Sequence, residues 1–213
     1  MKALVTGGAG LIGSHIVDKL CNKGFDVVIL DNLEPEAHRG KKPNWVPKKC
    51  KFIRGDVRNK NDLFQAMKDV DIIFHQAAYG GFSTELSKFI DVNGLGTNRI
   101  FDVINEKKLK IKKIVVASSQ AVYGEGKYKC KKHGLSFPPM RPVEQLLKRQ
   151  WEAKCDICKA DLDSLPTDEK KIIDPSHVYS VSKYAEEKIA LLLGKQLGIP
   201  TVALRYSITY GPR

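Results

Sequence analysis

The sequence predicts an α/β fold built on a doubly wound parallel sheet. Three observations lead to this prediction. A glycine-rich turn joins a short apolar strand to an amphipathic helix, an acidic residue ends the next apolar strand, and strands alternate with helices along most of the 213 residues. A chain of this length is sufficient for one well-buried domain with a small appendage.

The first strand is expected at Lys2–Thr6, and the helix that follows it is expected to stop at Gly24. Between them stand Gly7, Gly10 and Gly13. In a dinucleotide-binding turn the first glycine permits the tight bend and the middle one lets a pyrophosphate approach the backbone. The last glycine lets the helix pack close to the strand, with its N-terminal N–H groups facing the phosphates.

The second strand, Phe25–Leu30, ends at Asp31, about 20 residues after the glycine turn. An acid at this place binds the ribose hydroxyls of NAD, and its charge repels the 2′-phosphate of NADP. We therefore expect NAD as the cofactor and interpret Arg39 as a solvated loop residue. The alternative is an ordinary β-turn in an unrelated α/β domain.

The remaining elements continue the alternation, apart from a polar loop expected at residues 32–50 and an interruption at residues 125–165. The domain is thus expected to span residues 1–213 with one insert at 125–165. Further strands are expected at Lys51–Arg54, Asp71–His75, Lys113–Ala117 and Thr201–Arg205, and helices at 63–70 (capped by Asn61 or Asp62), at 85–107 and from about Asp174 to Leu197.

Polar and small residues follow several of these strands. Asp56 is placed to meet an adenine amino group, or else it is a helix cap or turn former. Ala77 and Ala78 are small enough for a cofactor to lie close to the backbone. Asn93 stands inside a predicted helix, where it needs a partner for its amide or is simply solvated.

A catalytic set is predicted from Tyr179, Lys183 and Ser119. The first two are four residues apart and share one helix face. A lysine ammonium beside a phenol favours the phenolate, which can then take a proton from a substrate hydroxyl while hydride leaves for NAD. Ser119 ends the fifth strand and is placed to hydrogen-bond the same substrate oxygen.

Eight short segments carry a shared pattern: Thr6–Gly13, Asp31–Leu33, Gly55–Val57, His75–Ala78, Val92–Thr97, Ser118–Gly124, Tyr179–Lys183 and Leu204–Tyr206. In these segments the chain resembles the extended short-chain dehydrogenase/reductases. Within that family it is most similar to the nucleotide-sugar epimerase group. The segments span nearly the whole chain outside residues 125–165.

The resemblance implies an enzyme in which bound NAD oxidises C4 of a nucleotide-diphosphate sugar to a ketone and returns the hydride to the other face. It implies Tyr179 as base, Lys183 as its partner and Ser119 as hydroxyl donor. It also implies cofactor contacts from Gly7, Gly10, Leu11, Ile12, Gly13, Asp31, Asn32, Asp56, Val57, Ala77, Ala78, Asn93, Tyr179 and Lys183.

The resemblance further implies a homodimer formed through the helices that bear Asn93 and Tyr179. Two other functions stay open from the sequence. One is a related short-chain sugar-nucleotide reductase or dehydrogenase, and the other is a non-catalytic NAD-binding module.

Three features depart from the family pattern. Ser119-Gln120-Ala121 stands where the sugar dehydratases carry Thr-Asp-Glu, so dehydration is not expected. Ile208 occupies the place of an asparagine that contacts substrate in the epimerases. Family members also continue for roughly another hundred residues, which form a substrate-binding lobe. The sequence therefore indicates a fragment or an epimerase without its own lobe.

The insert contains two ligand pairs, Cys130-Lys-Lys-His133 and Cys155-Asp-Ile-Cys158, separated by 21 residues. Three thiolates and one imidazole in this pattern resemble a zinc ribbon, so we expect a structural zinc ion. The alternatives are a redox dithiol formed by the second pair, or four unrelated loop residues.

The net charge of +12 comes from scattered lysines and two denser runs, Lys107–Lys113 and Lys127–Lys132. We interpret these as solvated faces, because no nucleic-acid recognition motif accompanies them. No apolar run approaches the roughly 20 residues that cross a bilayer, and no leader is recognised, so a cytoplasmic protein is expected. The remaining cysteines, Cys21 and Cys50, are expected to be buried fillers.

Overall fold

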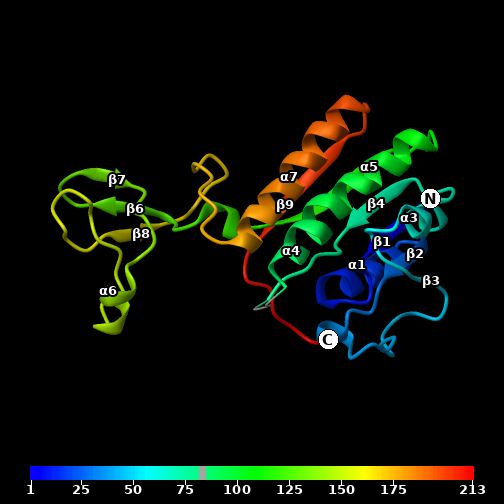
Figure 1. The fold of residues 1–213 in the computed structure, drawn as a ribbon, viewed down its shortest axis with the longest axis horizontal. Helices are drawn as coiled ribbons and strands as arrows, with labels where there is room; N and C mark the ends of the chain where they lie inside the picture. The colour runs from blue at the N-terminus through cyan, green and yellow to red at the C-terminus, as the bar shows by residue number, and fades with distance from the viewer. Residues whose placement is uncertain (82–84) are drawn as a thin grey trace. The chain divides into compact units, whose positions relative to one another are not determined.

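The computed structural model describes residues 1–81 and 85–213, which form two compact units (Figure 1). The larger unit comprises Met1–Ser119 together with Ser182–Arg213, and the smaller unit comprises Gln120–Val181. The chain passes between the units after β5 and again within helix α7 (Val178–Gln196). No helix among the described residues has the length and apolar character needed to span a bilayer.

The larger unit is built on a six-stranded parallel sheet with the order β3-β2-β1-β4-β5-β9. This is the order of a doubly wound dinucleotide-binding sheet, so the predicted fold class is confirmed. The order reverses direction between β1 and β4, and this reversal is the switch point of the sheet. The strands are β1 (Lys2–Thr6), β2 (Asp26–Asp31), β3 (Lys51–Arg54), β4 (Ile72–His75), β5 (Lys113–Ser119) and β9 (Thr201–Tyr206).

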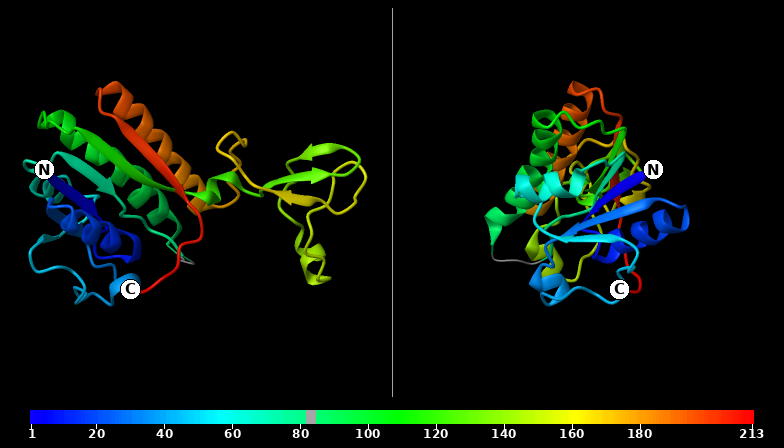
Figure 2. Two further views of the ribbon diagram at one scale, coloured as in Figure 1. Left: turned by 180° about the vertical axis from the view of Figure 1, so that it is seen from behind. Right: turned by 90° about the vertical axis from the view of Figure 1, so that its right-hand side faces the viewer.

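Helices cover both faces of this sheet. Right-handed crossovers place α1 (Leu11–Asn22) on one face, and α3 (Lys60–Met67) and α5 (Gly96–Glu106) on the other, as Figure 2 shows. Because both faces are covered, the central strands carry continuous apolar runs rather than alternating ones. Leu4, Ile29, Ile73 and Ile114 are almost completely buried in this core.

The predicted stop of the first helix and the two buried cysteines are confirmed. Gly24 follows α1 with φ +77°, and its N–H donates to the Cys21 carbonyl. Cys21 and Cys50 are both buried, and their sulfur atoms lie 3.3 Å apart as free thiols.

Three predicted boundaries were wrong. The loop at residues 32–50 contains a short helix, α2 (Pro35–His38), which begins at a proline, a residue favoured in a first turn. The cap of α3 is Asn59, whose Oδ1 accepts the N–H of Asn61 at 2.8 Å; neither Asn61 nor Asp62 is the cap. The long helix α7 begins at Val178, four residues later than expected.

The helix expected at residues 85–107 is not uniform. It consists of α4 (Leu86–Phe89), a π-helical segment at Ile90–Leu95, and then α5. The π-helical segment holds Asn93, and a π-bulge of this kind commonly marks a functional position.

The smaller unit contains a three-stranded antiparallel sheet with the order β7-β6-β8. The unit spans Gln120–Val181, a wider stretch than the insert expected at residues 125–165. Its elements are a 3₁₀ turn (Gln120–Tyr123), β6 (Lys127–Cys130), β7 (Gly134–Ser136), α6 (Val143–Leu147) and β8 (Asp163–Leu165).

Candidate functional site

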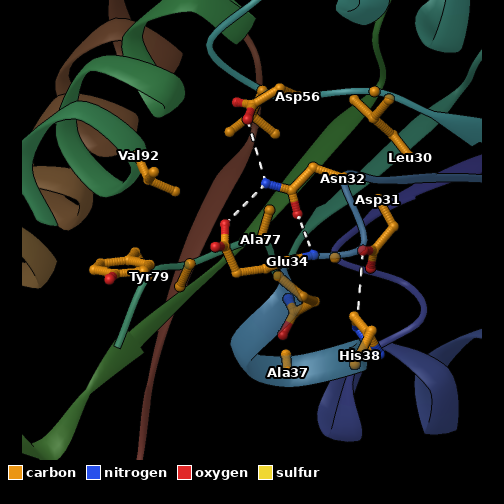
Figure 3. A pocket seen from close by; sticks show the side chains of 16 residues that line it. Leu30, Asp31, Asn32, Glu34, Ala37, His38, Asp56, Ala77, Tyr79 and Val92 are labelled. Atoms are coloured by element: carbon orange, nitrogen blue, oxygen red, sulfur yellow. Dashed lines mark hydrogen bonds and ion pairs between the residues drawn. The ribbon is translucent and has the colours of Figure 1, made fainter. Parts of the chain in front are cut away.

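A cavity of about 140 Å³ opens where the sheet reverses direction, at the carboxyl ends of its strands (Figure 3). Ligands of doubly wound sheets bind at this place. Eight residues predicted from the sequence to contact the cofactor line the cavity: Gly7, Gly10, Asp31, Asn32, Asp56, Val57, Ala77 and Ala78.

The glycine turn is shaped by two close backbone approaches. Gly7 has φ +64°, and a Cβ built on it would lie 2.7 Å from Ala77 Cα. A Cβ on Gly13 would collide with the carbonyl oxygen of Gly7. Any side chain at these two positions would therefore displace the turn from the neighbouring strand or helix α1 from the turn.

Three predicted cofactor residues in the first turn of α1 do not line this cavity. Gly13 is buried inside the turn. Leu11 and Ile12 line a second hollow, together with Tyr206 and the segment 209–212. Their predicted contribution to cofactor binding would come from backbone N–H groups at the start of the helix.

Asp31 connects the glycine turn to the loop after β2. Its Oδ2 accepts the N–H of Ala9 at 3.0 Å, and its Oδ1 accepts the N–H of Leu33 at 2.9 Å. His38 Nε2 lies 3.8 Å from the same carboxylate (Figure 3). The carboxylate thus fixes the loop on the rim of the cavity that it lines.

Asp56 lines the cavity and forms a turn, which was one of the roles foreseen for it; its contact with an adenine amino group stays a prediction. Its Oδ1 accepts the backbone N–H of Arg58 at 2.8 Å, and the guanidinium of Arg58 binds both carboxylate oxygens. Burial alone would raise the pKa of Asp56, but the hydrogen bonds and charge of Arg58 hold it below its ordinary value. Asn32 Nδ2 donates to Asp56 and to Glu34, each at 3.3 Å.

His75, at the end of β4, is completely buried between two threonines. Thr97 donates its hydroxyl to the Asn93 carbonyl at 2.6 Å, so it receives the N–H of His75 Nε2 at 2.9 Å. Nδ1 then accepts from the hydroxyl of Thr6 at 2.6 Å. This network requires a neutral imidazole, in agreement with burial and the nearby Lys183 charge, which lower its pKa to about 3.

Lys183 is buried, and its ammonium pairs with a carboxylate that the sequence analysis missed. Its Nζ lies 2.5 Å from Glu186 Oε2, one helical turn further along α7. Burial raises the pKa of Glu186 to about 7, although the Lys183 charge opposes this shift. The second oxygen, Oε1, has no hydrogen-bond partner and lies 3.8 Å from His75 Nε2.

The next residue, Glu187, ties α7 to the sheet. Its carboxylate accepts the hydroxyl of Ser118 at 2.7 Å and two nitrogens of the Arg205 guanidinium at 2.7 and 3.0 Å. Burial would raise the pKa of Glu187, but Arg205 and Ser118 hold it below its ordinary value. The three side chains therefore join β5, α7 and β9.

Asn93 is buried and fully hydrogen-bonded, so it is not a solvated residue. Its Oδ1 accepts the N–H of Tyr79 at 2.7 Å, and its Nδ2 donates to the Tyr79 carbonyl and to Ser182 Oγ at 2.9 and 2.8 Å. Asn93 is not among the residues lining the cavity, whereas Tyr79 is. Tyr79 thus connects Asn93 to the cavity.

The other predicted catalytic residues lie at the ends of two elements. Ser119 is buried as the last residue of β5 in the larger unit. Tyr179 lies in the first turn of α7, four residues before Lys183, and its ring stacks on that of His177 at a centroid distance of 6.0 Å.

The four predicted metal ligands of the insert lie together, with their ligand atoms within 4.8 Å of one another.

Several residues of the site were not found from the sequence. Glu34, His38 and Tyr79 line the cavity, and Glu186 pairs with Lys183. Only Glu186 left a recognisable signal, since it falls three residues after Lys183 and thus on the same face of the predicted helix. Glu34 and Tyr79 come from loops and His38 ends the four-residue helix α2, so none of them belongs to a periodic pattern that the sequence could show.

Comparison with known proteins finds similar sequences and structures, several of which are named as nucleotide-sugar enzymes. The model of the NAD-dependent epimerase/dehydratase family matches residues 3–145. A protein provisionally assigned as a UDP-glucose 4-epimerase of Methanocaldococcus jannaschii is 38% identical over 99% of this chain and 56% of its own length. The dTDP-L-rhamnose 4-epimerase of Burkholderia thailandensis is 31% identical over 99% of this chain and 58% of its own length.

Solved structures show the same similarity. The NAD complex of Thermus thermophilus UDP-glucose 4-epimerase has a TM-score of 0.73 and 30% identity, over 100% of this chain and 57% of that one. The UDP-glucuronic acid 4-epimerase of Bacillus cereus, in complex with UDP-glucuronic acid and NAD, has a TM-score of 0.74 and 26% identity, over 100% and 58%.

The chain thus spans a little over half the length of these relatives. The family match covers most of the described sheet, and it includes the glycine turn, Asp31 and Asp56. With the strand order and the position of the cavity, these findings show that the chain belongs to the NAD-dependent epimerase/dehydratase family.

Proposed function

We propose that the chain is the cofactor-binding part of an NAD-dependent nucleotide-sugar 4-epimerase. The observation that supports this most strongly is the cavity at the switch point, which is lined by the glycine turn, Asp31 and Asp56 in a chain of this family. The relatives named above include UDP-sugar and dTDP-sugar 4-epimerases. A nucleotide-diphosphate sugar is therefore the substrate class that we propose.

The residues present fit NAD. The backbone at Gly7 comes so close to Ala77 that a Cβ would fill the space between them, which leaves a bare peptide surface beside the cavity. We assign the pyrophosphate to this turn and the first N–H groups of α1, the adenosine ribose to Asp31 and Asn32, and the adenine to Asp56 and Val57.

When bound, NAD would supply an acceptor and donor of hydride at the sugar C4. The protein's part is to move the hydroxyl proton. We assign Tyr179 Oη as the base that takes this proton and returns it, Ser119 as the donor that orients the same oxygen, and Lys183 as the cation that favours the phenolate. Because the hydride returns to the sugar, no net oxidation occurs.

Two measurements test the proposal on the protein that contains this chain. Calorimetry should show that residues 1–213 bind NAD, and the affinity should be much weaker in Asp31→Ala. Interconversion of UDP-glucose and UDP-galactose should occur without accumulation of NADH. Tyr179→Phe should lower the rate by at least about 100-fold while NAD still binds, and Tyr184→Phe, on the same helix, should retain activity.

The alternatives predict different results. A reductase or dehydrogenase would accumulate NADH or consume it in proportion to the sugar converted. A non-catalytic module would bind NAD and show equal, negligible turnover in the wild type and in Tyr179→Phe. Failure to bind NAD would overturn the proposal altogether.

We also propose a homodimer. Apolar side chains are exposed along α4 and the π-helical segment, at Leu86, Ile90 and Leu95, and on α7 at Leu191 and Leu192. Exposed apolar surface of this kind is suited to a subunit interface. Light scattering should give twice the chain mass, and a monomeric mass at micromolar concentration would contradict this proposal.

The zinc ion expected in the insert has no step in the proposed reaction. Four protein ligands leave no open position for a substrate oxygen, and so we propose a structural role for this ion.

A further inference from the structure

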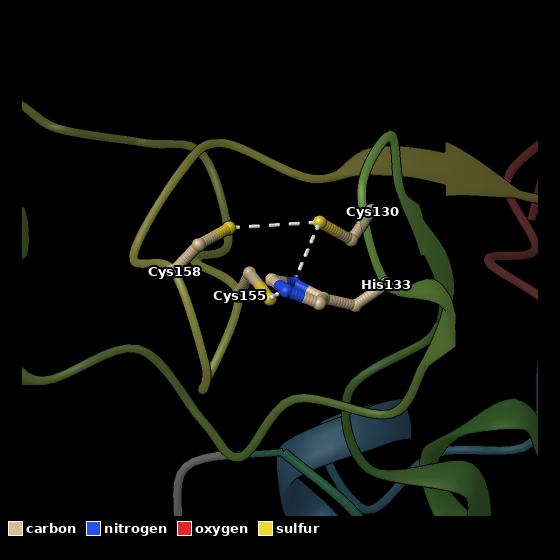
Figure 4. A group of neighbouring side chains, drawn as sticks. All are labelled: Cys130, His133, Cys155 and Cys158. Carbon is tan, nitrogen blue, oxygen red and sulfur yellow. Dashed lines mark hydrogen bonds between the residues drawn. The ribbon is translucent and has the colours of Figure 1, made fainter.

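The smaller unit brings together two chain segments that are far apart in sequence and presents four soft or borderline ligands at one point (Figure 4). Cys130 ends β6, and His133 lies in the turn to β7. Cys155 and Cys158 lie in a second turn, closed by a β-bridge between Lys154 and Asp161. This site lies outside the cavity of the larger unit and does not depend on the proposed epimerase function.

Three distances between the ligand atoms match those of a tetrahedral zinc site. Zn–S and Zn–N bonds of about 2.3 and 2.0 Å at tetrahedral angles put two sulfurs about 3.8 Å apart, and a sulfur and a nitrogen about 3.5 Å apart. The sulfur atoms of Cys130 and Cys158 are 3.7 Å apart. His133 Nδ1 lies 3.5 Å from Cys130 Sγ and 3.4 Å from Cys155 Sγ.

Backbone N–H groups surround the sulfur atoms. The amides of Ile157 and Cys158 donate to Cys155 Sγ, those of Lys132 and His133 donate to Cys130 Sγ, and that of Ala160 donates to Cys158 Sγ. Such donors orient thiolate ligands and spread their negative charge, as the outer shell of a metal site does. An accidental group of cysteines would not place turn amides around each sulfur.

The smaller unit also lacks a hydrophobic core of useful size. Its buried cluster consists of Cys130, Ala153, Cys155 and Leu162, with Tyr128 and Cys158 packed against it. Half of the four buried members are therefore ligands. A segment as short as residues 127–165 usually needs a metal or disulfides to be stable, because chains below about 40 residues bury too little apolar surface, and Cys130, Cys155 and Cys158 are free thiols.

We infer that Cys130 Sγ, His133 Nδ1, Cys155 Sγ and Cys158 Sγ bind one zinc ion in a closed tetrahedral site, and that this ion replaces a hydrophobic core in the folding of residues 127–165. Three thiolates and Zn²⁺ leave one negative charge, which the lysines flanking the ligands in both turns offset.

Metal analysis of the purified chain tests the ligand set. The wild type should carry one zinc per chain after gel filtration. Cys155→Ser and His133→Ala should lose most of it, whereas His133→Cys should retain it, because a fourth thiolate still completes the tetrahedron. Cys21→Ala is the matched control, since this cysteine is buried in the core of the larger unit with its sulfur beside that of Cys50, and the variant should keep one zinc. Equal zinc in the wild type and Cys155→Ser, or no zinc in a wild type reconstituted with zinc chloride under reducing conditions, would overturn the inference.

Replacement with Co²⁺ tests the geometry. A tetrahedral thiolate site should show the strong visible absorption of four-coordinate Co²⁺, which zinc then displaces. Weak absorption typical of six-coordinate Co²⁺ would contradict a closed site.

Limited proteolysis tests the role in folding. Removing zinc with a chelator should speed tryptic cleavage at Lys129, Lys132, Lys154 and Lys159 by at least tenfold. NAD binding, which reports on the larger unit, should remain unchanged. Cleavage rates at these lysines that do not respond to zinc removal would overturn the folding role, even if zinc were bound.

Discussion

Lys183 Nζ lies 2.5 Å from Glu186 Oε2, and both side chains are almost completely buried in the larger unit. His75, equally buried, is 3.8 Å from the other oxygen of the same carboxylate. Burial lowers the pKa of His75 and raises the pKa of Glu186. The stability of the fold should therefore depend on pH.

The sign of each contribution follows from proton binding. His75 takes up a proton below pH 6.5 when unfolded and only near pH 3 when folded, so its contribution to stability falls as the pH drops from 6.5. Glu186 loses its proton near pH 4.5 when unfolded and near pH 7 when folded, so its contribution rises as the pH drops from 7. Between pH 6.5 and 4.5 the two slopes oppose each other.

Glu186→Gln should therefore make the fold more sensitive to acid. Without the glutamate, the slope from His75 remains, and the free energy of unfolding should fall by about 1.4 kcal/mol per pH unit more steeply than in the wild type between pH 6.5 and 4.5. Urea unfolding at a series of pH values measures this difference. Parallel curves for the two proteins would show that Glu186 does not titrate in this range.

Gly7→Ala should lower the free energy of unfolding by more than the positive φ of Gly7 alone explains. Gly7 and Gly24 both have positive φ, but a Cβ on Gly24 meets nothing within 4 Å, whereas one on Gly7 runs into Ala77. Gly24→Ala should destabilise by about 1 kcal/mol and keep NAD binding. Gly7→Ala should destabilise by about 3 kcal/mol or more and lose it. Thermal unfolding and calorimetric NAD titration give both quantities, and equal costs would contradict the steric argument.

Asn93→Ala should destabilise the larger unit by about 2–4 kcal/mol, because it removes three buried hydrogen bonds that the Asn93 amide makes to Tyr79 and Ser182. Asn105→Ala, at an exposed position of the neighbouring helix α5, is the control and should change stability by less than about 0.5 kcal/mol. A small effect of Asn93→Ala would mean that water replaces the amide.

Arg205→Met should cost about 3 kcal/mol, because it leaves the Glu187 carboxylate buried with only the Ser118 hydroxyl. Adding Glu187→Gln to this variant should recover part of the loss, since the unpaired charge disappears. A double-mutant cycle from chemical denaturation gives the coupling energy. Additive losses in the double variant would indicate that the pair does not interact.

Features that depend on local backbone requirements were predicted from the sequence, and features that depend on packing were not. Glycine spacing, apolar strands and Asp31 report local backbone requirements, so they predicted the sheet and half of the residues that line the cavity. The Asn59 cap, the short helix α2 and the π-helical segment at Asn93 depend on competition between neighbouring polar groups, and the sequence alone did not resolve that competition.

Partners in the interior were harder still to predict. The contacts of His75 with Thr6 and Thr97, and of Glu187 with Ser118 and Arg205, join residues that lie between 18 and 69 positions apart. Only packing of the elements brings such residues together. The Cys and His ligands were the exception, because their paired spacing reflects turns that position ligands locally.

One contact of the smaller unit brings the two ends of the insert together. The N–H of Asp174 donates to the carbonyl of Val122 at 3.0 Å, so the chain returns to the place from which it left about fifty residues earlier. Adjacent ends make an inserted segment removable. A deletion that joins residues 124 and 174 through a few glycines would need little extra closure entropy. Removal of this inserted segment would leave the register of every strand in the parallel sheet unchanged, so the two units are separable by a single deletion.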